Sequence, residues 1–398
     1  MFSLLLRSRP AGVHVARVSL PKYRSLSTTS PTRTNRAIVY SQNGNPAEVL
    51  SVLTYPSLAH PTSGTVNIRY LLSPINPADV NVVEGVYPSK PTLTSNLVQS
   101  GKGSKDEPVF IGGNEGLAQV TSIGENVDGL NVGDWVVMVK QQAGTWSASQ
   151  NVNAQDIVKI PNQGLSEVHA ATITVNPPTA YNMLMDYVEL QEGDWVMQNG
   201  ANSAVGQAVI QIAAARGLKT LNFVRNRDDI SQLKDQLRKI GATQVLTYDD
   251  LNDKSLRDKV KTWLGGKEIL LALNCVGKGG ETTEMLRYMG KDGHLVSYGA
   301  MSKQPLSLPT SAFIFKNLTA HGFWQSRWYL VRSRAEREQL MATLTSLMKE
   351  GKLAAPEHEV VSIDGQDSDG EATTKIRNVF QRLAAGRYGK KVLLKFDE

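Results

Sequence analysis

The sequence of 398 residues contains one cysteine, Cys275, and only six histidines. A single cysteine excludes an internal disulfide framework and the cysteine-rich structural zinc sites. The histidines are scattered along the chain, and no two of them stand at the spacing of metal ligands. No apolar run is long enough to cross a bilayer, so no membrane span is expected. A chain of this length has room for two domains of ordinary size.

Acidic residues are absent from the first 47 positions, which hold seven Lys and Arg residues among many Ser and Thr. An arginine-rich, serine-rich and acid-free segment is typical of a mitochondrial transit peptide. Residues 1–35 are therefore predicted to be one, and the mature protein is expected in the mitochondrial matrix. The alternative is a disordered basic arm that binds nucleic acid. The chain carries a net charge of +6, of which these seven residues supply +7, so the remainder carries −1. A nearly neutral body argues against nucleic-acid binding by the folded part.

Short β-rich runs bounded by turn residues follow this leader, among them RAIVYSQ, TVNIRYLLS and GDWVVMVK. Such runs predict a mostly antiparallel barrel or sandwich. From about Ser166 strand-like and helix-like patterns alternate, which predicts an α/β fold with a doubly wound parallel sheet. The polar stretch 89–108 is expected to be a surface loop, and so is DGQDSDGE near Asp364. The closing segment GKKVLLKF is strand-like and is expected to return to the first domain.

The segment VMQNGANSAVGQAVIQIAAARG places a glycine-containing turn between a predicted strand and a predicted helix. Such a turn lets the backbone approach a pyrophosphate, and the helix N-terminus offers its N–H groups to the negative charge. The glycine pattern is imperfect, because Ser203 and Ala204 stand between Gly200 and Gly206. A tight turn without a ligand is the alternative interpretation.

The end of the following strand, FVRNR, indicates which dinucleotide is bound. An NAD site has Asp or Glu at this point for the ribose 2′-hydroxyl, whereas Arg225 and Arg227 suit a 2′-phosphate. The cofactor is therefore predicted to be NADPH. Two solvated arginines at the edge of a sheet are the alternative.

Several longer motifs carry a resemblance to a known family. GGNEGLAQVTSIGENVDGLNVGDWV followed by GANSAVGQAVIQIAA is similar to the medium-chain dehydrogenase/reductase superfamily. More narrowly, SPINPADVNVVEGVYPSKP, TVNPPTAYNML, LALNCVG, YGAMSKQP and GFWQSRW resemble the mitochondrial trans-2-enoyl thioester reductases of fungal type. The match extends over nearly everything after the leader. It implies a GroES-like catalytic domain (residues 36–170 and 330–398) and a Rossmann domain that binds NADPH (residues 171–329).

Zinc-dependent members of this superfamily use Cys and His ligands, one of them from a Gly-His-Glu motif. Here that motif reads Gly113, Asn114 and Glu115, and Cys275 lies far along the chain. The sulfur and imidazole ligands of a catalytic zinc are missing from these positions, so no metal is predicted. Reduction of an activated C=C bond is then the expected chemistry, with hydride added to the β-carbon and a proton to the α-carbon.

The resemblance assigns roles residue by residue. It implies that Tyr87, in the turn EGVYPSKP, donates the proton, and an ordinary tyrosine pKa of about 10 keeps the phenol protonated at physiological pH. The alternative for Tyr87 is packing against an apolar patch. Trp324 is a candidate for lining the acyl channel, or else a buried anchor between domains. The implied cofactor-binding residues are Asn176 on the nicotinamide side; Asn202, Ser203, Ala204 and Val205 at the pyrophosphate; Arg225, Asn226 and Arg227 at the adenosine phosphate; Tyr298, Gly299, Ala300 and Met301 beside the nicotinamide ribose; Phe323, Trp324 and Gln325 over the cofactor; and Lys390 near it.

The expected function is NADPH-dependent reduction of trans-2-enoyl thioesters, carried by acyl carrier protein or coenzyme A, in mitochondrial fatty-acid synthesis. Quinone reduction by the same fold and a non-catalytic NADPH-binding protein are the alternatives. The resemblance also implies a homodimer that forms through edge strands of the cofactor domains. The basic residues that are candidates for contacting an acidic carrier or coenzyme A phosphates are Lys102, Lys105, Arg327, Arg332 and Arg334; solvated loop charges are the alternative for them.

Overall fold

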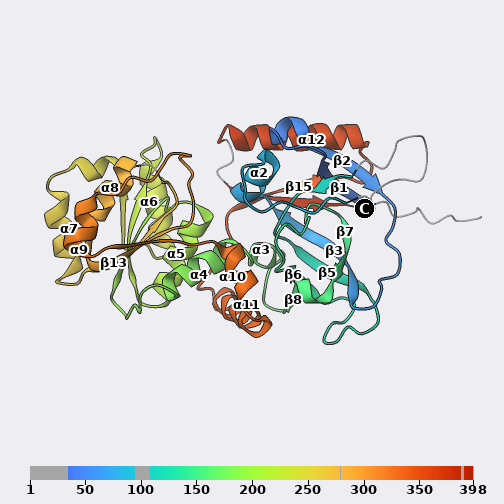
Figure 1. Ribbon diagram of the computed structural model, residues 1–398, viewed down its shortest axis with the longest axis horizontal. Coiled ribbons are helices and arrows are strands. Elements are labelled where there is room, and N and C mark those ends of the chain that lie inside the picture. Colours follow the sequence, from blue (N-terminus) through green and yellow to red (C-terminus); the bar gives the residue numbers. More distant parts are fainter. Residues whose placement is uncertain (1–34, 95–107, 278, 387–389, 398) are drawn as a thin grey trace, which may run out of the picture. The chain divides into compact units, whose positions relative to one another are not determined.

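The computed structural model describes residues 35–94, 108–277, 279–386 and 390–397, and Arg33–Glu398 forms one compact unit (Figure 1). The predicted leader lies outside the described residues except for Asn35, where the first strand begins. Lys102 and Lys105 also lie outside them. None of the helices within these ranges is long and apolar enough to cross a membrane.

The first part of the chain forms two mostly antiparallel sheets, as its β-rich runs predict. A three-stranded sheet contains β1 (Asn35–Tyr40), β2 (Ser51–Tyr55) and β4 (Phe110–Ile111). A seven-stranded sheet contains β3 (Thr65–Pro74), β5 (Leu117–Ile123), β6 (Trp135–Met138), β7 (Ser149–Asn153), β8 (Ile157–Ile160), β15 (His358–Ile363) and β16 (Lys391–Phe396). β16 runs parallel to β15 and antiparallel to β3. The end of the chain therefore returns to the first sheet, as predicted.

The second part forms the predicted parallel sheet. Its strands are β9 (Trp195–Asn199), β10 (Lys219–Val224), β11 (Gln244–Thr247), β12 (Ile269–Asn274), β13 (Met289–Ser297) and β14 (Thr319–Gly322). They lie in the order β11-β10-β9-β12-β13-β14, and all five neighbouring pairs are parallel. Counted from β9, this is the order 3-2-1-4-5-6 of dinucleotide-binding folds, in which the ligand binds at the carboxyl ends of the strands.

Helices cover both faces of this sheet. Successive side chains of a strand point to opposite faces, and in β9 the side chains on both faces are buried in apolar clusters. Val196 of β9 packs in one core cluster with Val209 and Ile212 of α5 (Ala204–Ala215). Its neighbours Trp195 and Met197 belong to another cluster, together with residues of α7 (Leu256–Leu264). The other helices associated with this sheet are α4 (Asn176–Met185), α6 (Ile230–Lys239), α8 (Gly279–Leu286) and α9 (Thr310–Lys316).

The remaining helices lie elsewhere along the chain. They are α1 (Pro46–Val49), α2 (Pro77–Glu84), α3 (Glu167–Ala171), α10 (Gln325–Val331), α11 (Arg334–Lys349), α12 (Asp369–Ala384) and two short 3₁₀ turns, Ala154–Asp156 and Asp249–Asn252.

The prediction of a loop throughout DGQDSDGE is wrong in its second half, where α12 begins at Asp369. The Ser368 side chain accepts a hydrogen bond from the Glu371 backbone N–H, and the Glu371 carboxylate accepts one from the backbone of Ser368. This reciprocal cap is the Ser-x-x-Glu signal of a helix start, which the sequence already contains. α12 then packs on β2 (Figure 1).

Candidate active site

The turn between β9 and α5 is shaped for close approach of a ligand to the backbone. Gly200 has a φ of +60°, which favours glycine, and a Cβ added to Gly206 would lie 2.6 Å from the carbonyl oxygen of Ala201. The Ser203 hydroxyl caps α5 by accepting from the backbone N–H of Gly206 at 3.1 Å. The other first-turn N–H groups of α5 have no partner within the helix, as at every helix N-terminus. The predicted residues 202–205 therefore fit a pyrophosphate.

Arg225, Asn226 and Arg227 follow β10 directly, and all three are exposed. The Asn226 side chain donates to the Asp249 carboxylate at 2.7 Å. Nε of Arg227 lies 3.6 Å from the Asp229 carboxylate. Two exposed guanidinium groups at the carboxyl end of β10 fit a 2′-phosphate, although Asp229 neutralises part of the Arg227 charge.

The predicted segments 298–301 and 323–325 follow β13 and β14. Backbone N–H groups tie them to neighbouring strand ends: Tyr298 donates to Asn274, Met301 to Cys275, and Phe323 to Ser297, each at 2.9 Å. Carboxyl ends of parallel strands meet at one edge of a sheet, so both segments share that edge with the β9–α5 turn.

Tyr87 lies in the loop after α2, and its hydroxyl contacts Trp324. The indole Nε1–H of Trp324 donates to the Tyr87 oxygen at 2.7 Å, and the two rings meet edge to face with 6.0 Å between centroids. An indole N–H only donates, so the O–H proton of Tyr87 remains available to another acceptor. Burial raises the pKa of the Tyr87 hydroxyl above its ordinary value. Trp324 is 36% exposed, which does not fit a buried anchor.

The loop that carries Tyr87 is held at its start. Gly85 ends α2 with a φ of +80°, and a Cβ there would lie 2.9 Å from Asn43, whose side-chain amide donates to the carbonyl groups of Val82 and Val83. The Lys303 ammonium also lies 3.4 Å from the Glu84 carboxylate.

A buried polar cluster surrounds Asn76, and most of it was missed by the sequence predictions. The Asn76 side-chain amide donates to Glu115 at 2.9 Å, while its oxygen accepts from the Lys391 ammonium at 2.5 Å and from the Asn176 amide at 3.4 Å. The Asn76 backbone N–H donates to Asp79 at 2.7 Å. Of these residues only Asn176 is in the predicted site.

Sequence patterns could have identified some residues of this cluster but not others. Asn-x-x-Asp at 76–79 is a helix cap pattern that identifies Asn76 and Asp79. No pattern distinguishes Lys391 from the predicted Lys390. The structure places Lys390 exposed before β16 and Lys391 in the cluster.

The Asp79 carboxyl is 2% exposed, and its burial raises its pKa from 3.8 to about 7, although the Asn76 backbone N–H and the Lys391 ammonium lower it. A raised pKa in the folded state contributes stability that is fully present below about pH 4 and is lost as the pH rises through about 7. Asp79→Asn keeps an acceptor for Asn76 and cannot ionise. We therefore expect it to raise the melting temperature at pH 8 relative to wild type and to change it less at pH 5. The corresponding gain in the free energy of unfolding at pH 8 has a ceiling of about 4 kcal/mol.

Thermal unfolding at both pH values measures this difference. Asp194→Asn is the matched control, because a hydrogen bond from Lys267 lowers the pKa of Asp194. Its carboxylate stays ionised at both pH values, so we expect the same small destabilisation at each. An Asp79→Asn shift that is equal at pH 5 and pH 8 would contradict the prediction.

The residues at the zinc-motif positions do not fit a zinc ion. The Asn114 side-chain oxygen accepts from the backbone N–H of Gln142. Cys275 is buried, with its sulfur 3.7 Å from the carbonyl oxygen of Asn199. In the described part of the chain no three His, Cys, Asp or Glu side chains are arranged to hold a metal. The absence of a metal in the working protein stays a prediction.

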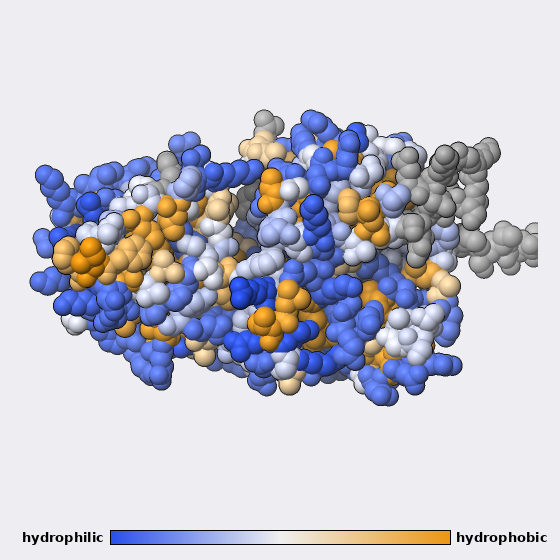
Figure 2. All heavy atoms as spheres, in the orientation of Figure 1, coloured by the Kyte–Doolittle hydropathy of each residue, from blue (hydrophilic) through white to orange (hydrophobic). Residues whose placement is uncertain are grey.

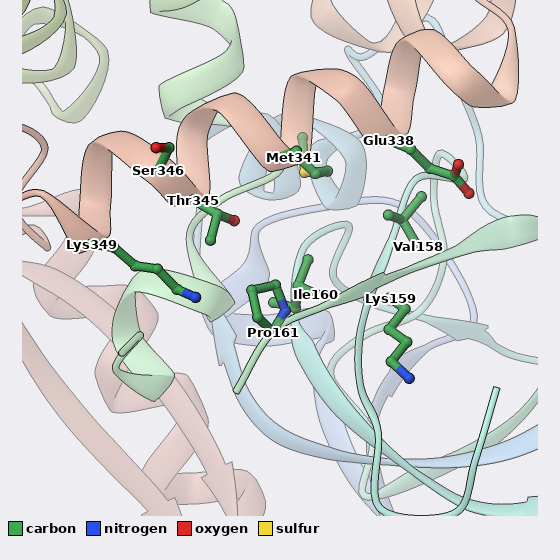
Figure 3. A pocket seen from close by; sticks show the side chains of 10 residues that line it. Val158, Lys159, Ile160, Pro161, Glu338, Met341, Thr345, Ser346 and Lys349 are labelled. Atoms are coloured by element: carbon green, nitrogen blue, oxygen red, sulfur yellow. The ribbon is translucent and has the colours of Figure 1, made fainter. Parts of the chain in front are cut away.

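Three further features lie apart from these residues. His294 and His321, on neighbouring strands β13 and β14, have ring nitrogens 2.8 Å apart. Arg332 and Arg334, the predicted carrier-contacting residues, form ion pairs with Glu336 and Glu338, whereas Arg327 is exposed. A cavity of about 340 Å³ lies between β8 and α11 (Figure 3). None of the predicted site residues lines it.

Comparison with known families agrees with this fold. Residues 62–171 match the alcohol dehydrogenase GroES-like domain, and residues 204–346 match the zinc-binding dehydrogenase family. Together with the strand order, these matches define an oxidoreductase with a GroES-like domain and a Rossmann domain. Structures of a putative quinone reductase from Bacillus thuringiensis and of Escherichia coli quinone oxidoreductase share this fold, at TM-scores of 0.73 and 0.71 and 21% and 22% identity.

More similar relatives specify the family. The mitochondrial enoyl-[acyl-carrier-protein] reductase of Yarrowia lipolytica is 42% identical over 91% of this chain and 92% of its own length. The human protein of the same name is 40% identical over 89% of this chain and 90% of its own. The Candida tropicalis mitochondrial 2-enoyl thioester reductase, solved as an Etr1p/Etr2p heterodimer, superposes with a TM-score of 0.82 at 35% identity, over 91% of this chain and 100% of that one. The chain belongs to the mitochondrial enoyl-[acyl-carrier-protein] reductase family.

Proposed function

We propose that this protein reduces trans-2-enoyl thioesters, carried by acyl carrier protein or coenzyme A, to saturated acyl thioesters with NADPH. A structural relative, Etr1p, has been solved with NADP and crotonyl-CoA, at a TM-score of 0.82 and 34% identity over 91% of this chain and all of that one. The observation in this chain that carries the proposal is the Tyr87–Trp324 pair. Its phenol accepts from the Trp324 indole N–H and also hydrogen-bonds with the Ser326 side chain, and it carries an O–H that can donate.

The residues at the carboxyl edge of the parallel sheet would hold the cofactor. Residues 202–205 would bind the pyrophosphate, residues 225–227 the 2′-phosphate, and Asn176 with residues 298–301 and 323–325 the nicotinamide half. When bound, NADPH supplies the hydride that is added to the β-carbon.

Tyr87 would supply the proton that is added to the α-carbon. Its raised pKa keeps the hydroxyl protonated at neutral pH, so that an acid is present when negative charge develops on the thioester. Trp324 holds the oxygen from the other side, which leaves the O–H directed away from the indole.

NADPH oxidation with two substrates tests this function. We expect wild-type protein to oxidise NADPH with trans-2-hexenoyl-CoA and to do so much more slowly with 1,4-naphthoquinone. Turnover of the quinone without the enoyl thioester would favour quinone reductase activity instead. NADPH binding without turnover of either substrate would favour a non-catalytic protein.

The assembly and location of the protein are part of the proposal. β14 is the edge strand of the parallel sheet, and its residues are mostly exposed. α9, which precedes β14 in the chain and contacts β13, carries the exposed apolar side chains Phe313, Ile314 and Phe315, which contribute to a hydrophobic surface over this helix (Figure 2). The open edge of β14 and the apolar patch on the preceding helix support a homodimer formed through β14. The relatives' names place them in the mitochondrion, and the acid-free leader supports import of this chain into the matrix.

A further inference from the structure

The side-chain amide of Asn76 lies between two groups of opposite charge, the buried Glu115 and the half-buried Lys391. Glu115 accepts from four donors: Asn76 Nδ2, the Thr174 hydroxyl, and the backbone N–H groups of Thr174 and Val175. In all four contacts the Glu115 carboxyl oxygens act as acceptors. The Lys391 ammonium, on the other side, acts only as a donor.

These two charges fix the orientation of the Asn76 amide. In the opposite orientation its NH₂ would face an ammonium, and its oxygen would face a carboxylate, at hydrogen-bond distance inside the protein. Charged hydrogen bonds are about twice as strong as neutral ones, and an unpaired charge is costly when buried, as Glu115 is at 0% exposure. The Asn76 oxygen therefore points toward Lys391 and Asn176.

The orientation of Asn76 determines that of Asn176. Because Asn76 presents an oxygen, Asn176 presents its NH₂ to it, at 3.4 Å. Its own oxygen, Oδ1, is then directed away from Asn76. Within the described ranges this oxygen accepts no hydrogen bond, although the residue is only 8% exposed. A nearly buried amide thus keeps one open acceptor.

We propose that Glu115, Asn76 and Lys391 form a positioning relay that makes Asn176 a hydrogen-bond acceptor toward the cofactor. This inference rests on the proposed function and adds to it the group that is recognised. The Asn176 Oδ1 atom accepts a hydrogen bond from the N–H of the nicotinamide carboxamide. This N–H distinguishes NADPH from analogues that have a carbonyl but no amide at that position. Glu115, Asn76 and Lys391 act through Asn176 and do not touch the cofactor.

Two variants separate the relay from simple support of the fold. Lys391→Met removes the ammonium but leaves Glu115 to hold the Asn76 NH₂, so the orientation of Asn176 is kept. Glu115→Gln combined with Lys391→Met reverses it. A glutamine must turn its oxygen to the backbone N–H groups of Thr174 and Val175, so that its NH₂ faces Asn76. Asn76 then turns its oxygen to that NH₂ and its own NH₂ to Asn176, which leaves a donor toward the cofactor.

Equilibrium binding of NADP⁺ and of its 3-acetylpyridine analogue, measured by calorimetry, tests whether Asn176 presents an acceptor or a donor to the cofactor. This measurement does not depend on catalysis. The analogue keeps the carbonyl and lacks the amide N–H. We expect wild type and Lys391→Met to bind NADP⁺ about three- to tenfold more tightly than the analogue, the worth of one neutral hydrogen bond. The double variant should lose this preference or reverse it. Thermal unfolding of each variant confirms that it is folded.

An unchanged preference in a folded double variant would overturn the relay, and so would a wild type that binds both dinucleotides equally. In either case the binding of NADP⁺ leaves the proposed function standing. If wild type binds neither dinucleotide, the proposed function fails and the relay fails with it.

Discussion

Replacing Tyr87 with phenylalanine is expected to lower kcat for trans-2-hexenoyl-CoA reduction by a factor of about 10² to 10⁴, the usual contribution of a positioned general acid. The substitution removes one oxygen and keeps the ring that packs against Trp324. The affinity for NADPH should change little, because the pyrophosphate turn and Arg225 lie on other segments. Steady-state kinetics with NADPH at saturation measure the loss in kcat, and a separate titration measures NADPH binding.

A matched substitution distinguishes the acid from a general effect of losing a hydroxyl. Tyr288 is a half-buried tyrosine just before β13, at the end of the sheet opposite to the predicted site. Tyr288→Phe should therefore retain wild-type kcat. If Tyr87→Phe reduces the enoyl thioester at the wild-type rate, Tyr87 does not deliver the proton.

The double variant Arg225→Ala/Arg227→Ala is expected to lower the preference for NADPH over NADH by about 10² to 10⁴. Each guanidinium would form a charged hydrogen bond with the 2′-phosphate, and such bonds contribute about 1.5–3 kcal/mol each. NADH has no 2′-phosphate, so its kcat/KM should change little. The ratio of kcat/KM for the two cofactors measures the preference.

The two single variants should lose different amounts of the preference for NADPH. Arg227 lies 3.6 Å from Asp229, which offsets part of its charge, so Arg225→Ala is expected to cost more than Arg227→Ala. Arg238→Ala is the control, because Arg238 is an exposed arginine paired with Asp235 on α6. An equal loss of kcat/KM with NADPH and with NADH would mean that the two arginines support the fold and do not bind the 2′-phosphate.

The elements that local patterns specify were predictable from the sequence. β9, the glycine turn and α5 follow from a buried run, a turn and helical spacing within about twenty residues, and the residues that follow β10 are placed by the same unit. The domain boundaries at residues 170 and 329 stay a prediction. Contacts between distant segments were not predictable, because no local pattern encodes them. The Tyr87–Trp324 bond joins residues 237 positions apart.

Lys390 and Lys391 illustrate the limit most clearly. Successive side chains of a strand point to opposite faces, so a difference of one residue exchanges the buried face for the exposed one. The register of β16 is set by its pairing with β15 and β3, which the segment itself does not reveal. The resemblance implies that Lys390 lies near the cofactor, and that role stays a prediction; the lysine whose ammonium the fold brings to Asn76 is Lys391.

The position of β16 has a consequence for the order in which the protein is made. Its core residues Leu393 and Leu394 pair with the end of β3, more than three hundred residues earlier in the chain. During synthesis, β3 and Asn76 leave the ribosome long before the strand and the ammonium that complete them. The first domain therefore cannot finish folding until β16 has been synthesised, and a nascent chain that already contains Tyr87 and the whole dinucleotide-binding sheet still lacks Lys391.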